Sequence, residues 1–332
     1  MRIRALLGIG LVAVLLLAFP HRSSAQAPRQ VSIGMASSSL PGGVARIAKE
    51  MGLYEKHGLD ARVIPMDSGS VAMAGLISGS IDFSTTAGSD VVVAQARGQD
   101  IVPVMRLYGG FSAVVVLSKD AAGRLNVSPN APVTERLKAL NGLVIASPAA
   151  TSSFTLALKP SAEAAGAQIR LTYMAQSAMV AALENGAIQG FIASAPFYAF
   201  PVLRKIGVPW INGPKGEFPK TYLPATASGL ATKRTFASSN PDVIKRMREV
   251  FVDFEKSVKE KPADVKAAIA RLFPSLDEAT LEFLYESESA SFIANLPTAE
   301  DMTREIEFVK ASGENVPNLD KLNAAAMLLP PG

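Results

Sequence analysis

Four short runs of serine, threonine and glycine each follow a strand-like segment and precede a segment with helical periodicity. A helix N-terminus leaves N–H groups without partners, and nearby hydroxyls add donors, so such runs suit the binding of a polar or anionic solute. Serine and threonine are also preferred N-caps, so any single run has a purely structural explanation. The runs are Ser37, Ser38 and Ser39; Gly69 and Ser70; Thr85, Thr86 and Ala87; and Thr151, Ser152 and Ser153. Together they predict binding by hydrogen-bond donors rather than nucleophilic catalysis.

The segments that position these runs alternate between strands and helices. Strands are predicted at 31–35, 61–66, 81–84 and 101–107, and a similar alternation restarts with strands at 111–117, 143–147, 169–173 and 188–194. Residues 119–132 are interpreted as a surface loop, the stretch from 211 to 224 as an irregular connection, 226–232 as a strand, and 241–261, 263–272, 278–293 and 298–312 as helices. The pattern predicts an α/β fold with parallel sheets, in which ligands bind beyond the carboxyl ends of the strands.

Four segments carry a resemblance to a known family. They are AKEMGLYEKHGL at 48–59, AGLISGSIDF at 74–83, LKALNGLVIAS at 137–147 and AALENGAIQGF at 181–191. In this order they resemble the periplasmic substrate-binding proteins of ABC transporters in the nitrate/sulfonate/taurine group (SsuA/THI5-like, NMT1-like). Gln189 departs from the pattern, which often has aspartate there, and this departure loosens the assignment to any one substrate.

The resemblance implies a fold like that of the type II periplasmic binding proteins, with two α/β lobes, a hinge and a ligand cleft between them. Lobe one is expected to comprise residues 28–110 and 226–332, including the C-terminal helices, and lobe two residues 111–225. The loop after the strand at 188–194 is expected to face the cleft, which adds Ser194, Ala195 and Pro196 to the ligand-binding residues. Tyr108, after the strand at 101–107, is a further candidate.

The N-terminus predicts export. Arg2 and Arg4 precede an uncharged apolar run of about 15 residues, which is short for a bilayer span of about 20. Small residues follow, so we predict a signal peptide at 1–27, cleaved after Ala27, and a periplasmic location. Loss of residues 1–27 removes three arginines and lowers the formal net charge from +4 to +1, which gives no basis for a nucleic-acid partner. The chain has no cysteine, so disulfides are excluded.

We therefore expect a monomeric solute-binding component that captures a small organic anion, such as a sulfonate or carboxylate, and delivers it to an ABC permease and its ATPase. No catalytic residue, cofactor or metal is expected. His57, the one histidine outside the predicted signal peptide, is interpreted as an exposed turn residue. Asp67 and Asp90 are the acids nearest the polar runs, and Arg46 and Arg106 are the nearest bases. They are expected to form surface or interlobe ion pairs, and pairing with a charged ligand is the alternative. Two alternatives stay open: a THI5-like enzyme or binder of pyrimidine precursors, and a solute sensor for a membrane kinase.

Overall fold

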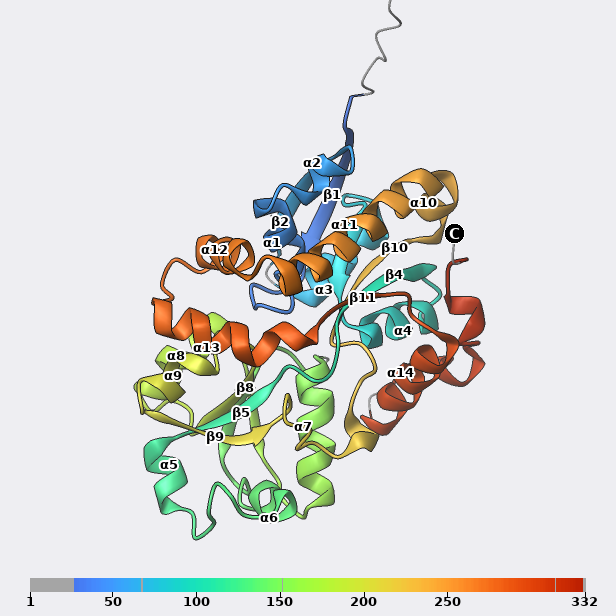
Figure 1. Cartoon of the computed structure of the whole chain (residues 1–332). Helices are drawn as coiled ribbons and strands as arrows, with labels where there is room; N and C mark the ends of the chain where they lie inside the picture. Colours follow the sequence, from blue (N-terminus) through green and yellow to red (C-terminus); the bar gives the residue numbers. More distant parts are fainter. Residues whose placement is uncertain (1–26, 67, 151, 314, 331–332) are drawn as a thin grey trace, which may run out of the picture.

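The computed structural model describes residues 27–330, except 67, 151 and 314, and it contains two β-sheets with helices packed on them (Figure 1). We call the part built on the six-stranded sheet lobe one and the part built on the five-stranded sheet lobe two. Apart from Ala27, the predicted signal peptide lies outside the described residues. No described helix is both long enough and apolar enough to cross a membrane.

The sheet of lobe one has the strand order β11-β4-β10-β3-β1-β2. Its strands are β1 (Arg29–Met35), β2 (Leu59–Pro65), β3 (Phe83–Thr86), β4 (Ile101–Tyr108), β10 (Ser228–Lys233) and β11 (Phe292–Asn295). β1 pairs in parallel with β2 and β3, whereas β10 is antiparallel to both β3 and β4. The expectation of a purely parallel sheet is therefore wrong, because a strand from much later in the chain separates β3 from β4.

The sheet of lobe two has the order β7-β6-β8-β5-β9. Its strands are β5 (Val114–Ser118), β6 (Val144–Ser147), β7 (Arg170–Tyr173), β8 (Gly190–Ala193) and β9 (Gly207–Asn212). β6 pairs in parallel with β7 and β8, and β5 is antiparallel to β8 and β9. The sequence analysis missed β9 because Gly207 and Pro209 resemble turn residues. Proline is tolerated there because β9 is an edge strand.

Helices connect the strands in both lobes (Figure 1). Lobe one has α1 (Val44–Glu50), α2 (Leu53–Lys56), α3 (Gly69–Ser78) and α4 (Gly88–Ala96) between its first strands. Lobe two has α5 (Lys119–Arg124), α6 (Val133–Lys138), α7 (Ser153–Ala164), α8 (Gln176–Glu184) and α9 (Ala199–Leu203). α5 lies in the stretch interpreted as a loop. Ser118 begins it, because the hydroxyl of Ser118 accepts a hydrogen bond from the N–H of Ala121 at 3.1 Å.

The C-terminal helices contact both lobes, not lobe one alone. They are α10 (Arg234–Ser239), α11 (Pro241–Glu260), α12 (Pro262–Leu272), α13 (Glu278–Glu288) and α14 (Ala299–Ala311), with the 3₁₀ turns η1 (Lys220–Tyr222), η2 (Ser289–Ser291), η3 (Leu319–Lys321) and η4 (Ala325–Met327). α11 is amphipathic and buries Met247, Phe251 and Phe254 against lobe one. α13 packs against α9, and α14 packs against α7, so both helices lie at the boundary between the lobes (Figure 1).

The chain crosses between the lobes twice, at 109–113 and at 213–227, and the two crossings touch. The N–H of Gly213 donates to the carbonyl oxygen of Ala113 at 2.9 Å. A Cβ atom on Gly213 would lie 2.4 Å from that oxygen and 2.5 Å from the carbonyl oxygen of Phe111. Only glycine allows this approach, so the two crossings form one compact hinge.

Two buried glutamates, one on each boundary helix, reinforce this region. Glu288 of α13 accepts hydrogen bonds from the hydroxyls of Tyr108, in lobe one, and Tyr198, in lobe two, the latter at 2.6 Å. Glu305 of α14 accepts one from the N–H of Thr226 in the second crossing at 2.6 Å. Burial raises the pKa of each glutamate to about 8. Both carboxyls are therefore shielded from water, and each is hydrogen-bonded to groups at the boundary between the lobes.

Candidate functional site

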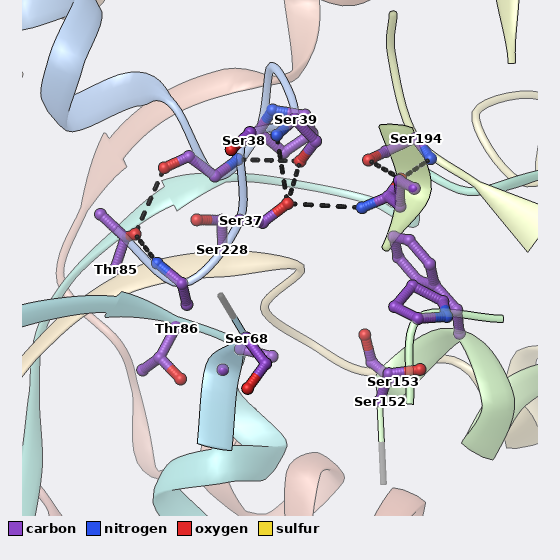
Figure 2. Close-up of a pocket in the computed structure, with 18 of the residues that line it drawn as sticks. Ser37, Ser38, Ser39, Ser68, Thr85, Thr86, Ser152, Ser153, Ser194 and Ser228 are labelled. Atoms are coloured by element: carbon purple, nitrogen blue, oxygen red, sulfur yellow. Dashed lines mark hydrogen bonds between the residues drawn. The ribbon is translucent and has the colours of Figure 1, made fainter. Parts of the chain in front are cut away.

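A cavity of about 400 Å³ lies between the two lobes, and its lining includes Ser112 and Ala227 of the two crossings. Loops at the carboxyl ends of the parallel strands form its walls, after β1, β2 and β3 in lobe one and after β6, β7 and β8 in lobe two. Figure 2 shows serine and threonine side chains from both lobes around this space. A cavity of this size holds a small molecule.

Most of the residues predicted from sequence line this one cavity. They are Ser37, Ser38, Ser39, Gly69, Ser70, Thr85, Thr86, Ala87, Ser152, Ser153 and Ser194. Ala195 and Pro196 are not among the lining residues, although the carbonyl oxygen of Ala195 accepts a hydrogen bond from the N–H of Leu40 at 2.7 Å. Thr151 lies outside the described residues.

Tyr108 does not reach the cavity, contrary to the expectation from its place after β4. Its side chain is only 1% exposed, and its hydroxyl bonds to Glu288. The reason is that β11 pairs with the end of β4, with Phe292 opposite Tyr108, and so brings α13 over this position. Tyr108 therefore belongs to the hinge side of the boundary.

Several of the lining hydroxyls have structural roles. The hydroxyl of Ser152 accepts from the N–H of Thr155 at 3.3 Å and caps α7, as Ser68 caps α3 through the N–H of Val71 at 3.3 Å. Thr85 donates its hydroxyl to the carbonyl oxygen of Gly42 at 3.2 Å, which fixes the loop after β1. These groups shape the cavity walls and position the remaining donors.

Three other lining serines have hydroxyls with no such role. Ser112, Ser153 and Ser228 are 2%, 9% and 5% exposed, and their hydroxyls make no hydrogen bond with the described part of the chain. The three hydroxyl oxygens are not fully enclosed by protein atoms, so they are open to the cavity that these serines line. The sequence did not indicate Ser112 and Ser228, because Ser112 lies in the first crossing and Ser228 begins β10 directly after the second, not at helix N-termini.

Gln176, also missed, links the two lobes across the cavity. Its Oε1 accepts from the N–H of Ser194 at 2.8 Å and from the hydroxyl of Ser194 at 3.1 Å. Its Nε2 donates to the hydroxyl of Ser37, in lobe one, at 3.3 Å. Since Gln176 begins α8 immediately after β7, its position at a strand end was the signal available in the sequence. The contact is neutral and long, so it restrains separation of the lobes only weakly.

Asp90 is the only described lining residue with a charged side chain. Its Oδ2 accepts from the hydroxyl of Thr86 at 2.7 Å and from the N–H of Ala87 at 3.3 Å. Burial raises the pKa of Asp90 above its usual range, while these two hydrogen bonds act in the opposite direction. Asp90 forms no ion pair with the described residues, whereas Arg106 pairs with Asp301 of α14 at 3.1 Å and Arg46 with Glu50 at 3.0 Å. Asp67 lies outside the described residues.

Apolar side chains complete the walls. Phe154 and Phe197 line the cavity with Met66, and Phe111 packs edge-on against Phe154 with ring centroids 5.7 Å apart. An organic solute with a polar head and a short apolar body fits such a mixed surface.

The sequence profile of the NMT1-like family matches residues 24–273. The chain belongs to the NMT1-like family.

Similar proteins agree with this membership. The chain is 25% identical over 264 residues to a putative aliphatic sulfonates-binding protein of Bacillus subtilis (strain 168), covering 76% of this chain and 74% of that protein. The fold is that of the alkanesulfonate-binding protein SsuA of Xanthomonas axonopodis pv. citri bound to MOPS, with a TM-score of 0.73 and 18% identity over 91% of this chain and 98% of that one. The nitrate-binding protein NrtA of Synechocystis PCC 6803 superposes with a TM-score of 0.62 and 13% identity, covering 90% and 86% of the two chains.

These likenesses confirm the predicted fold class, an α/β protein with two lobes of the type II binding-protein kind. They also confirm the family inferred from the four segments. Gln189, the departure noted in this NMT1-like chain, is not a lining residue, and its Oε1 accepts from the N–H of Val144 at 3.0 Å.

His57 is not among the residues that line the cavity. Its Nε2 is 2.8 Å from Oδ2 of Asp253 on α11, and its side chain is 17% exposed. His57 therefore lies in the turn after α2, as predicted, but it is half-buried against α11 and not exposed. Among the described residues, no group of histidine, aspartate and glutamate side chains gathers as metal ligands would.

Proposed function

We propose that this protein is the solute-binding component of an ABC importer and holds a small organic anion, such as a sulfonate or carboxylate, between its lobes. The observation that carries the proposal is the convergence of loops from both lobes, rich in hydroxyls, on one cavity. The sulfonate-binding and nitrate-binding relatives support an anionic solute.

The chemistry of the walls supports this solute class. Hydroxyls of Ser112, Ser153 and Ser228 open to the cavity are donors that can replace the water around an acidic oxygen. The N-terminus of α7 adds a partial positive charge beside Ser153. Neutral donors hold an anion without a buried counter-charge, so the solute stays exchangeable.

Delivery follows from lobe motion. In this proposal residues 28–110 with 226–332 move as one body and residues 111–225 as the other, about the hinge of the two crossings. Closure on the solute would generate the form that docks on the permease and its ATPase. The proposal also includes export to the periplasm as a monomer with cleavage after Ala27, and capture without turnover.

The test is a ligand screen with a matched pair of variants. Alkanesulfonates, carboxylates and nitrate are titrated by thermal shift, since a ligand of the folded state raises the melting temperature. Ser153→Ala should weaken the best ligand about tenfold, because it removes one hydrogen bond to a charged group. Ser257→Ala, equally buried at 9% but on α11, is the control.

Two results would contradict the proposal. One is the absence of binding across all the anions, and the other is equal affinity in the Ser153→Ala and Ser257→Ala proteins. Conversion of a bound compound by the purified protein would favour an enzyme instead.

A further inference from the structure

The carboxylate of Asp90 offers a binding feature that the hydroxyls do not. Both hydrogen bonds that it receives from the protein go to Oδ2. Its Oδ1 receives no hydrogen bond from the described residues and is not fully enclosed by protein atoms. Because Asp90 lines the cavity, this acceptor is open to a bound molecule.

A second aspartate shows how unusual this arrangement is within the chain. Asp301 occupies the same third position in α14, where its Oδ2 accepts from the N–H and the hydroxyl of Thr298, both at 2.9 Å. Its other oxygen is paired with Arg106 at 3.1 Å. Helix capping therefore accounts for one oxygen in each residue. The protein supplies a partner for the second oxygen of Asp301 and none for that of Asp90.

Closure of the lobes on a solute would remove water from Oδ1 of Asp90, so the solute must provide a replacement hydrogen bond. A carboxylate oxygen that loses water without gaining a donor is costly, and the cost is larger for a charged group than for a neutral one. A plain anion beside Asp90 would add repulsion between like charges. A solute that brings its own N–H or O–H group removes both penalties.

The two walls also separate the two kinds of contact. Asp90 lies one turn after Thr86, in lobe one, whereas Ser153 belongs to lobe two, and Figure 2 shows Thr86 and Ser153 on opposite sides of the space. A solute can therefore direct its donor group at one wall while its acidic oxygens receive hydrogen bonds from the other.

We propose that Asp90 makes the cavity selective for anions that also carry a hydrogen-bond donor, such as an ammonium or hydroxyl group on a short carbon chain. This inference rests on the proposed function and adds a requirement to it. Asp90 is a specificity-determining residue, because its Oδ1 accepts the hydrogen bond from the donor group of the ligand.

The test compares ligand pairs that differ only in the donor. Calorimetric affinities are measured for 2-aminoethanesulfonate and 2-hydroxyethanesulfonate against ethanesulfonate, and for 3-aminopropanoate against propanoate. The wild-type protein should bind the better donor-bearing member at least about tenfold more tightly, the effect of a charge-assisted hydrogen bond.

Asp90→Asn gives the decisive comparison. The asparagine retains an amide oxygen for Thr86 and Ala87 and presents an NH₂ group to the cavity. It should abolish or reverse the preference, with weaker binding of the donor-bearing anion and stronger binding of the plain one. Asp301→Asn is the control, and it should leave the preference unchanged even if it lowers the melting temperature.

The outcomes separate this inference from the proposed function. Tight binding of plain anions without any donor preference, or a preference that Asp90→Asn leaves intact, overturns the role of Asp90 while the binding function stands. No binding in either series overturns both.

Discussion

The two sides of the lobe boundary are built on opposite principles. On the cavity side, neutral and partly exposed groups meet across the gap, as Gln176 meets Ser37 at 3.3 Å. On the hinge side, Glu288 is fully buried between the hydroxyls of Tyr108 and Tyr198. The cavity side also has one buried contact, because the N–H of Leu40 donates to the carbonyl oxygen of Ala195 at 2.7 Å. Water can replace these neutral contacts when the first side separates, whereas separation of the second exposes a buried network of carboxyl and phenol groups.

This difference assigns separate tasks to the two sides. In the proposed function, the cavity side keeps hydroxyls available for a solute, and the hinge side keeps the lobes connected during closure. Glu305 extends the hinge side, because it anchors Thr226 in the second crossing. Stability should therefore respond strongly to changes at the hinge and weakly to changes at the cavity.

Gly213→Ala should give the largest effect. The added Cβ would meet two carbonyl oxygens of the other crossing at 2.4 and 2.5 Å, and backbone atoms cannot rotate away. We expect a loss of about 3 kcal/mol in the free energy of unfolding, measured by denaturant titration. Gly123→Ala is the control, because a Cβ there meets no atom and alanine favours the helix α5. Equal stability of the two variants would refute a tight hinge.

The buried glutamates should make stability depend on pH. Below about pH 4.5 the carboxyls of Glu288 and Glu305 are protonated in both the folded and the unfolded chain. As the pH rises towards about 8, the unfolded chain loses these protons first, so the free energy of unfolding falls and then levels off. Each group contributes at most about 1.4 kcal/mol per pH unit.

Glu288→Gln isolates one of these contributions. Its amide is neutral at every pH, so the free energy of unfolding should fall less steeply between pH 5 and 8. The slope should decrease by at most the value for one proton, about 1.4 kcal/mol per pH unit. Denaturant titrations at several pH values measure the slope. Acids with a lowered pKa, such as Glu217 and Asp253, titrate below this window and do not interfere. An unchanged slope would show that Glu288 is hydrated.

Gln176→Ala should give the smallest change in stability. It removes the long contact with Ser37 and also the acceptor of two hydrogen bonds from buried Ser194, so the free energy of unfolding should fall by about 1–2 kcal/mol. The unliganded protein should nevertheless be more open, with a larger radius of gyration in solution scattering. A large loss of stability would show that the cavity side also holds the lobes together, and it would contradict the difference between the two sides of the boundary.

Local pattern predicted much of the architecture, but distant partners decided the rest. Most strands, other than β9 and β11, and the polar runs after β1, β3 and β6 were predictable because hydrophobic runs and capping residues are local signals. The insertion of β10 beside β3 was not, because pairing between remote segments leaves no periodic mark. Tyr108 was misplaced for the same reason, since β11 and α13 arrive from the far end of the chain.

The candidate site divides in the same way. Serines at helix N-termini were predictable, whereas Ser112 and Ser228 are brought to the cavity only by the crossings. Asp90 was noted as an acid near the loops, but its open oxygen depends on which atom Thr86 contacts. Sequence therefore predicted where the cavity lies better than it predicted which atoms are free within it.

The late insertion of β10 also sets the order in which the nascent chain can mature. The strands of lobe two occupy a continuous stretch from Val114 to Asn212, whereas the sheet of lobe one is not joined until Ser228–Lys233 has been synthesised and is complete only with Phe292–Asn295. Until then β3 has one unpaired edge and β4 has two, and unpaired edges promote aggregation. Lobe two can thus complete its sheet before lobe one does, and the exposed strands of lobe one need protection from aggregation until β10 is available.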